Sequence, residues 1–261
     1  MVTGANQGIG KMVARSLAGN DFRVILACRN SDAGRATEME FKAEGLDVKF
    51  LQLDIGDSSS ITNFVSLLEE ECSVVDVLVN NAAIAFKASD PTPFREQAEP
   101  SFHVNFFGTC DLTAAMLPLL RKSLSAKIVN VASMAGHLRI LNANPNLKRA
   151  YAEVGSLSDL NVLAHAFVDE VKAGSHAAKG YPSSCYGMSK LCLIAFSKIM
   201  AKLEPLIQVN CCCPGYVSTS MSSFKGTKTP AEGAITPTLL ATLADKSVTG
   251  QFWSEGREVE W

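Results

Sequence analysis

Short apolar runs recur along the chain and alternate with longer segments in which apolar positions return every three or four residues. Such runs, rich in Val, Ile and Leu, are typical of parallel strands that helices cover on both faces. They predict strands at 22–28, 48–53, 75–79, 127–131 and 207–212, and the segments between them predict helices at about 10–18, 33–44, 58–71, 102–120 and 186–203. This order predicts an α/β fold of the doubly wound, Rossmann-like kind, with a mostly parallel sheet and helices on both faces.

Two segments interrupt this alternation of strands and helices. Residues 137–181 form a polar, helix-capable stretch, and residues 216–230 are rich in Ser, Thr, Lys and Gly. Neither segment has the composition of an interdomain linker, and the chain shows no internal repeat. We therefore expect a single domain over residues 1–261. The last apolar run, 250–253, predicts an edge strand that ends the sheet.

The composition narrows the classes of partner. The chain has 261 residues, of which 47% are hydrophobic and 19% charged, and a formal net charge of −2. It lacks the excess positive charge of nucleic-acid and polybasic membrane binders, so small molecules are the expected partners. No apolar run has the roughly 18 residues of a membrane span and no signal segment is present, which favours the cytoplasm. The eight cysteines and four histidines are scattered without metal-ligand spacing, so we expect reduced thiols and no metal site.

The amino-terminal sequence carries the first chemical signal. Thr3-Gly4-Ala5-Asn6-Gln7-Gly8-Ile9-Gly10 leads directly into the first predicted helix. Glycines let main-chain N–H groups approach a pyrophosphate, which the helix N-terminus also stabilises. A tight turn would explain the glycines equally well, but their place before an amphipathic helix favours a dinucleotide site. Where such sites carry an acid for the ribose 2′-hydroxyl, this chain has Arg29, which attracts a 2′-phosphate and favours NADPH over NADH.

A second signal consists of a hydroxyl, a phenol and an ammonium. Tyr186 and Lys190 are four residues apart, which places them on one face of a helix. A neighbouring ammonium should lower the pKa of the phenol from about 10, so that the pair can protonate a carbonyl oxygen. Ser133 follows the strand at 127–131, and the carboxyl ends of strands line the ligand crevice of such folds. We interpret Ser133 as a polarising hydroxyl; a helix cap or turn is the alternative, and no nucleophile motif surrounds it.

Together these motifs resemble those of the short-chain dehydrogenase/reductase superfamily. Its Thr-Gly-x-x-x-Gly-x-Gly signature is similar to Thr3 through Gly10, and its Tyr-x-x-x-Lys signature to Tyr186 through Lys190. The resemblance implies that Asn105 completes a catalytic tetrad with Ser133, Tyr186 and Lys190. It also implies an NADPH site built by Thr3, Gly4, Asn6, Gln7, Gly8, Ile9, Gly10, Arg29, Asp54, Ile55, Asn81, Tyr186, Lys190, Pro214, Val217 and Thr219.

Within this superfamily, the chain is similar to the cytosolic NADPH-dependent carbonyl reductases. The likeness lies in the sequences at 85–94, 181–187, 212–215 and 260–261, and in the 53 positions from Ser133 to Tyr186. In those reductases a helical insertion fills this interval and covers the surface by which their relatives form oligomers, so a monomer is implied. The implied substrates are quinones, aromatic ketones and aldehydes, and residues 216–230 are the implied substrate loop. The implied substrate residues are Phe86, Lys87, Gln97, Ser133, Met134, Tyr216 and Met221, of which Phe86, Lys87 and Gln97 match positions that accept glutathione conjugates.

The resemblance also implies how the tetrad works. Tyr186 protonates the carbonyl oxygen while NADPH delivers hydride to the carbon, and Ser133 orients and polarises that oxygen. Lys190 binds the nicotinamide ribose and lowers the pKa of Tyr186. Asn105 holds a water that links Lys190 to solvent for resupply of the proton.

Some positions depart from the family pattern. Only Met1 and Val2 precede Thr3, so the first strand should be short, and we expect lower stability or weaker cofactor binding than in a full-length relative. Gln7 stands where close relatives often carry a basic residue, which predicts a modest NADPH preference that depends on Arg29. Two alternatives stay open: a nucleotide-binding regulatory protein with little turnover, and an NAD-linked alcohol dehydrogenase.

Overall fold

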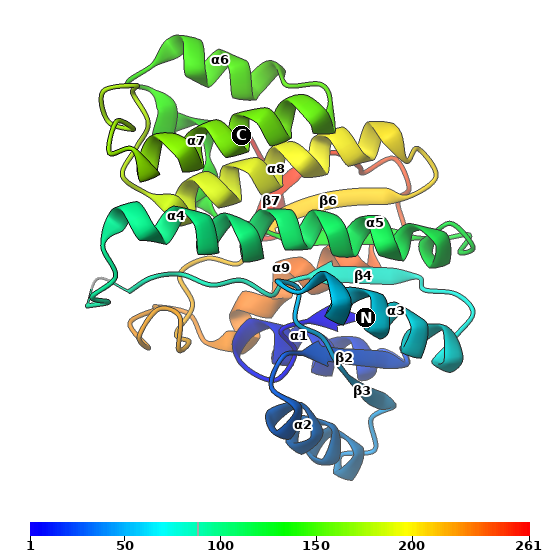
Figure 1. Cartoon of the computed structure of the whole chain (residues 1–261). Coiled ribbons are helices and arrows are strands. Elements are labelled where there is room, and N and C mark those ends of the chain that lie inside the picture. Colours follow the sequence, from blue (N-terminus) through cyan, green and yellow to red (C-terminus); the bar gives the residue numbers. More distant parts are fainter. Residues whose placement is uncertain (88) are drawn as a thin grey trace.

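A computed structural model describes residues 1–87 and 89–261 and contains an eight-stranded sheet (Figure 1). The strands are β1 (Val2–Thr3), β2 (Val24–Cys28), β3 (Val48–Gln52), β4 (Val77–Asn80), β5 (Lys127–Val131), β6 (Gln208–Cys213), β7 (Phe252–Ser254) and β8 (Arg257–Val259). They lie in the order β3-β2-β1-β4-β5-β6-β7-β8, and β8 runs antiparallel to β7 whereas the other neighbours are parallel. The predicted parallel α/β fold is confirmed.

The helices follow the predicted alternation with a few differences. They are α1 (Gly8–Ala18), α2 (Ser31–Ala43), α3 (Ser58–Glu71), α4 (Phe94–Phe102), the π-helix η1 (His103–Gly108), α5 (Thr109–Leu120), the 3₁₀ turns η2 (Met134–Gly136) and η3 (Leu138–Leu141), α6 (Pro145–Glu153), α7 (Leu157–Lys172), α8 (Cys185–Leu203) and α9 (Pro230–Thr242). The helix expected at 102–120 is the end of a longer unit that starts with α4 and passes through the π-helix.

Two expectations about the carboxyl-terminal part were incomplete. No helix was expected at α9. Its apolar residues point to most sides of the helix, so they do not recur at the spacing that marks one helix face. The run at 250–253 was expected to form the edge of the sheet, but β7 lies between β6 and β8, so that β8 is the edge strand. The turn Glu255-Gly256, in which both residues have positive φ, reverses the chain between β7 and β8. Such a two-residue turn brings the short, polar β8 back along β7.

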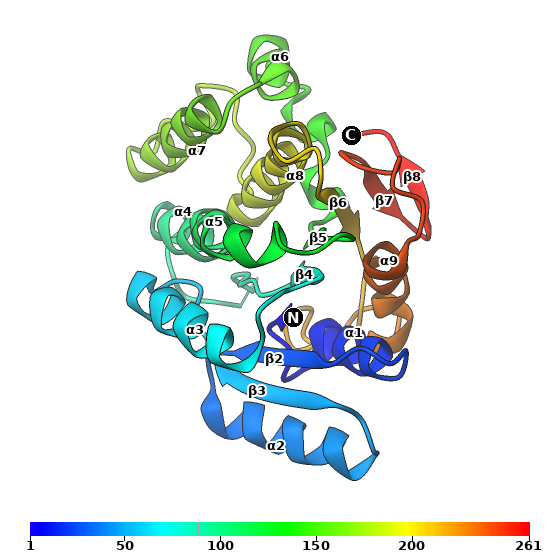
Figure 2. The ribbon, with the colours of Figure 1, turned by 90° about the vertical axis from the view of Figure 1, so that its right-hand side faces the viewer.

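Two hydrophobic cores lie on opposite faces of the sheet (Figure 2). Helices α3, α4, α5 and α8 cover one core, and α1, α2 and α9 cover the other. Ile128 and Val129 are neighbours in β5 but belong to different cores, because successive side chains of a strand point to opposite faces. Burial on both faces explains why the strands read as continuous apolar runs.

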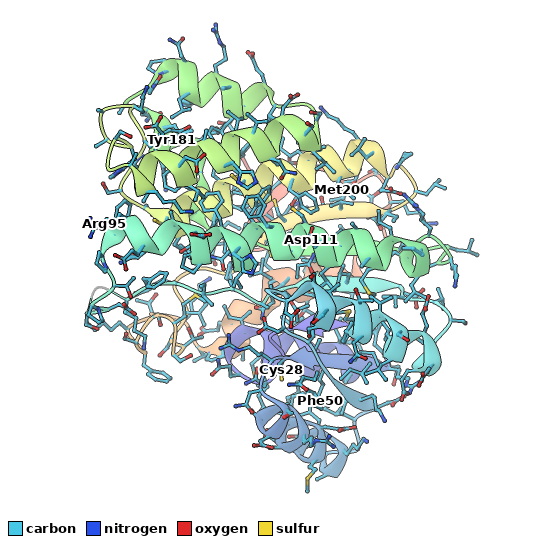
Figure 3. The ribbon with its side chains drawn as sticks, viewed as in Figure 1. Cys28, Phe50, Arg95, Asp111, Tyr181 and Met200 are labelled. Atoms are coloured by element: carbon cyan, nitrogen blue, oxygen red, sulfur yellow. The ribbon has the colours of Figure 1, made fainter. Side chains whose placement is uncertain are left out.

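The insertion forms an outer layer on one side of the molecule. Helix α7 packs against α4 and α8, and α6 packs against α8. The ring of Phe167 on α7 meets Tyr181 edge-on, with centroids 5.2 Å apart, and Tyr181 lies beside these helices in Figure 3. The Tyr151 hydroxyl of α6 donates to the main-chain oxygen of Leu163 at 2.9 Å. The polar segment predicted at 137–181 therefore folds back onto the helices of the domain.

The crevice of the fold lies beside β1. Strand order reverses there, because β2 and β3 extend to one side of β1 and β4 to the other. Val2 pairs with Leu26 on one side and with Val79 on the other, and it is fully buried. The first strand is as short as expected, and its effect on stability and cofactor binding stays a prediction. Ligands of doubly wound sheets bind at such a reversal, outside the carboxyl ends of the strands.

Candidate active site

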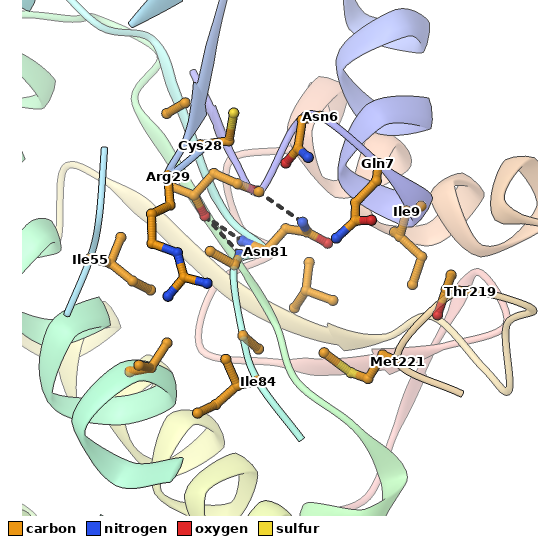
Figure 4. A pocket seen from close by; sticks show the side chains of 18 of the residues that line it. Asn6, Gln7, Ile9, Cys28, Arg29, Ile55, Asn81, Ile84, Thr219 and Met221 are labelled. Atoms are coloured by element: carbon orange, nitrogen blue, oxygen red, sulfur yellow. Dashed lines mark hydrogen bonds between the residues drawn. The ribbon is translucent and has the colours of Figure 1, made fainter. Parts of the chain in front are cut away.

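A cavity of about 290 Å³ opens at the carboxyl ends of β1, β2 and β4 (Figure 4). Most of the residues expected to bind the cofactor line its wall: Thr3, Gly4, Asn6, Gln7, Gly8, Ile9, Arg29, Asp54, Ile55, Asn81, Tyr186, Lys190, Pro214 and Thr219. Met221, expected at the substrate site, also lines it. Figure 4 places Arg29 and Ile55 at one end of the cavity and Thr219 and Met221 at the other.

The glycine loop brings bare backbone to the wall of this cavity. Gly4 and Gly8 have φ values of +64° and +55°, a conformation that glycine adopts without strain. A Cβ on Gly10 would lie 2.4 Å from the carbonyl oxygen of Gly4, so the turn can close only without a side chain there. Gln7 precedes α1 without capping it through its side chain. The first N–H groups of α1 are therefore without a side-chain cap, which suits an anionic ligand.

Hydrogen bonds join this loop to the end of β4. The Thr3 hydroxyl accepts from the main-chain N–H groups of Asn81 and Ala82, each at 2.9 Å. The Asn81 side-chain amide donates to the carbonyl oxygen of Thr3 at 2.8 Å. These hydrogen bonds between Thr3 and the start of the segment after β4 join the two strand ends that flank the crevice. The Thr3 hydroxyl and the Asn81 amide therefore already have hydrogen-bond partners within the protein.

Arg29 supplies positive charge at the outer end of the cavity. Its side chain is 77% exposed, and the guanidinium lies 4.0 Å from the Asp54 carboxylate. Such an exposed ion pair is weak, so the guanidinium can turn to another anion at little cost. Asn30, beside it, accepts from the main-chain N–H of Ala33 and caps α2. Cys28, whose side chain lies at the end of β2, completes this part of the wall.

Helix α8 carries Tyr186 and Lys190. Ser184 caps this helix by accepting from the N–H of Gly187 at 3.0 Å. Lys190 is 2% exposed, and its ammonium donates to the carbonyl oxygen of Val131 at 2.8 Å. The same nitrogen lies 5.7 Å from the centre of the Tyr186 ring. Burial lowers the pKa of Lys190 to about 8.

The pKa of Tyr186 differs from the expectation. Burial raises it to about 12, a hydrogen bond with Ser133 acts in the opposite direction, and Cys213 adds to the rise. Lys190 was expected to lower this pKa, but its ammonium is turned to Val131, and loss of hydration around the phenol dominates. The phenol is therefore protonated at neutral pH.

The Ser133 hydroxyl makes the capping contact that was the alternative interpretation, and its role as a polarising group stays a prediction. Ser133 follows β5 and Ala132, accepts from the N–H of Ala135 at 3.1 Å and so caps η2. The same side chain is near enough to the Tyr186 phenol to act on its pKa, which it lowers. The capping contact holds the hydroxyl beside the phenol.

Asn105 lies in the π-helix and is fully buried. Its side-chain oxygen accepts from the N–H of Ile84 at 2.8 Å, and its amide donates to the carbonyl of Ile84 and to the hydroxyl of Ser189. Ser189 donates in turn to the carbonyl of Tyr186 at 2.9 Å. The sequence reasoning missed Ser189, although its place directly before Lys190 puts it on the helix turn that carries Tyr186.

Several expected residues lie outside the cavity wall. Gly10 packs beneath the glycine loop, and Val217 is buried near Ile9 and Gly233. Gln97 on α4 donates to the carbonyl of Thr92. The others are Asn105, Ser133, Phe86, Lys87, Met134 and Tyr216, and their assignment to substrate or proton transfer stays a prediction.

The wall also contains residues that were not expected there. They are mostly small or aliphatic residues next to strand ends, and no polar pattern marks them in the sequence: Ala27, Cys28, Asn30, Leu53, Ala82, Ala83, Ile84, Val104, Val131 and Ala132. For all of them except Val104, which lies in the π-helix, a place at or shortly after the end of a predicted strand was the available signal. Within the described residues, no cluster of three or more His, Cys, Asp or Glu side chains is placed to hold a metal ion. No helix in the same ranges has the length and apolar character to cross a membrane.

Residues 1–145 match the family model of the short chain dehydrogenases. This chain belongs to that family. The short chain dehydrogenase is 41% identical over 273 residues to human carbonyl reductase [NADPH] 1, covering 100% of this chain and 97% of the relative, and 40% identical to the mouse protein of that name. It also resembles the solved structures of salutaridine reductase from Papaver somniferum (TM-score 0.90, 27% identity, 97% and 98% of the two chains) and menthone neomenthol reductase from Mentha piperita (TM-score 0.84, 27% identity, 98% of each chain).

Proposed function

We propose that the chain is an NADPH-dependent carbonyl reductase that converts quinones, aromatic ketones and aldehydes into hydroquinones or alcohols. The observation that carries this proposal is that Tyr186 and Lys190 line the same cavity as the glycine loop and Arg29. The full-length identity of 41% to human carbonyl reductase [NADPH] 1 supports it.

The residues present fit NADPH. The backbone of the glycine loop and the uncapped start of α1 suit a pyrophosphate, and the exposed guanidinium of Arg29 suits a 2′-phosphate. When bound, NADPH supplies the hydride that reduces the carbonyl carbon. Arg29 is the residue on which the preference for NADPH over NADH depends, because Gln7 offers no charge.

The protein residues supply the proton and the orientation. Tyr186 donates its phenolic proton to the carbonyl oxygen, and the phenol holds that proton at neutral pH because burial raises its pKa. Ser133 donates a hydrogen bond to the same oxygen and polarises the carbonyl. Lys190 binds the nicotinamide ribose and brings a positive charge near the phenol. The side-chain amide of Asn105 donates its two protons to Ile84 and Ser189. Asn105 can therefore hold a water for proton resupply only by accepting a hydrogen bond from it.

The remaining assignments rest on the resemblance to carbonyl reductases. Met134, Tyr216 and Met221 contact the substrate, and Phe86, Lys87 and Gln97 accept glutathione conjugates. A monomer is supported by α7, which covers α4 and α8. The same resemblance supports a cytoplasmic location.

The test is the initial rate of NADPH oxidation with a small quinone, for the protein as given and for Tyr186→Phe. Loss of a positioned proton donor should lower kcat by about 10²-fold to 10⁴-fold. Cofactor affinity, measured by the fluorescence of bound NADPH, should fall far less than kcat, because the other residues of the proposed NADPH site remain, and it serves as the control. NADPH binding without turnover in the unaltered protein would favour the regulatory alternative, and faster turnover with NADH than with NADPH would favour the NAD-linked alcohol dehydrogenase.

A further inference from the structure

The loop that follows β3 forms the cavity wall beside Arg29. Asp54 and Ile55 in this loop line the cavity, and the Asp54 carboxylate lies 4.0 Å from the Arg29 guanidinium. Figure 4 shows Ile55 and Arg29 at the same end of the cavity. Within the loop, the N–H of Gly56 donates to the Asp54 carboxylate at 3.0 Å, and the N–H of Asp54 donates to the Ser60 hydroxyl at 2.9 Å. An adenosine group bound beside Arg29 would therefore meet this loop.

The π-helix η1 packs against the loop at two points. His103 is the first residue of η1, and its Nε2 lies 2.6 Å from the carbonyl oxygen of Gly56. A carbonyl oxygen only accepts hydrogen bonds, so Nε2 carries a proton and donates it. At the other end of η1, a Cβ on Gly108 would lie 2.0 Å from the carbonyl oxygen of Ile55, so the backbones of helix and loop touch. The position of the loop is thus tied to that of η1.

The same π-helix reaches the reacting end of the cavity. Val104 lines the cavity, and Asn105 donates to Ser189 on the helix turn that carries Tyr186. Short π-helical turns are frequent at functional sites. His103 itself is exposed, and exposed side chains contribute little to the stability of a fold. Its specific contribution is therefore the hydrogen bond that holds the loop.

We propose that His103 is a positioning residue for the adenosine end of NADPH. It holds Gly56, and with it Asp54 and Ile55, where they line the cavity beside Arg29. His103 is not part of the cavity wall, so it acts on the cofactor through the loop. This inference rests on the proposed function and names a residue outside the cavity wall on which cofactor affinity depends.

The two halves of the cofactor separate the two ends of the site. Adenosine 2′,5′-bisphosphate carries the adenosine and the 2′-phosphate, and reduced nicotinamide mononucleotide carries the reacting ring. His103→Ala should raise Kd for the bisphosphate and for NADPH about threefold to tenfold, the loss expected for one hydrogen bond, and leave Kd for the mononucleotide unchanged. His103→Gln keeps an N–H donor near the place of Nε2 and should restore most of the affinity. Titration calorimetry and nicotinamide fluorescence measure these constants.

His165→Ala is the matched control. The ring of His165 on α7 stacks on Phe107 of η1, with centroids 4.6 Å apart. This variant therefore loses a histidine that contacts the same π-helix at Phe107 instead of the loop after β3. It should bind both halves of the cofactor as the unaltered protein does.

The outcomes separate this inference from the proposed function. A rise in Kd for the bisphosphate that is confined to His103→Ala and reversed in His103→Gln supports it. An unchanged Kd in His103→Ala overturns it, and so does an equal weakening of both halves or a His103→Gln variant as weak as His103→Ala. If the protein binds NADPH but reduces no carbonyl compound, the proposed reduction fails while the Kd values still decide the role of His103. If the unaltered protein binds neither NADPH nor the bisphosphate, both proposals fail.

Discussion

Replacing Lys190 with Met should stabilise the fold at neutral pH while removing activity. The ammonium is buried, and its pKa falls from 10.5 to about 8. A difference of about 2.5 units corresponds to about 3 kcal/mol of unfavourable free energy in the folded state at pH 7. Lys190→Met removes this penalty and also a hydrogen bond to Val131, worth about 1 to 2 kcal/mol. The net gain expected at pH 7 is about 1 to 2 kcal/mol.

The pH dependence identifies the cause of this gain. Below pH 8, Lys190 is protonated in both the folded and the unfolded chain, so the penalty is fully present. Between pH 8 and 10.5 the folded chain releases the proton and the unfolded chain keeps it, so the unaltered protein becomes more stable as pH rises. From pH 7 to pH 9.5 it should gain about 2 kcal/mol relative to Lys190→Met.

Urea unfolding of both proteins at the two pH values measures this change. The other titrating groups are common to both proteins and cancel in the difference. Lys202→Met removes an exposed lysine from the same helix and should leave the difference between the two pH values close to zero. The difference in unfolding free energy between Lys190→Met and the unaltered protein should change between pH 7 and pH 9.5. A constant difference would refute the lowered pKa of the buried Lys190.

Two further predictions concern the cofactor end of the cavity. Arg29→Ala should remove most of the preference for NADPH, because it deletes the charge proposed to face the 2′-phosphate. An NADPH affinity of the variant equal to that of the unaltered protein, measured by titration, would contradict this role. Gly10→Ala should weaken NADPH binding by at least tenfold, because its Cβ would collide with the carbonyl of Gly4 and reshape the loop. Gly19→Ala, at the end of α1 where a Cβ meets its nearest neighbour at 3.4 Å, is the matched control and should bind NADPH normally.

The sequence by itself determined the architecture and most of the residues that line the candidate cofactor cavity. Strands that are buried on both faces must be apolar throughout, and helices that cover one core must be apolar on one side, so both leave a periodic signal. The glycine loop is readable for a similar reason, because Gly4, Gly8 and Gly10 occupy positions where a Cβ would be strained or would collide. Tyr186 and Lys190 are close in sequence, so helix geometry alone brings them to one face.

Only the tertiary structure decided the hydrogen-bond partners and the pKa values of the residues around Tyr186. Lys190 turns to Val131, 59 residues away in sequence, and the burial of Tyr186 sets its pKa, which no local spacing could reveal. Asn105 reaches the turn of Tyr186 through Ser189, a contact across 84 residues. Local propensity fixes secondary structure and motifs, whereas desolvation and long-range hydrogen bonds arise only when distant segments pack together.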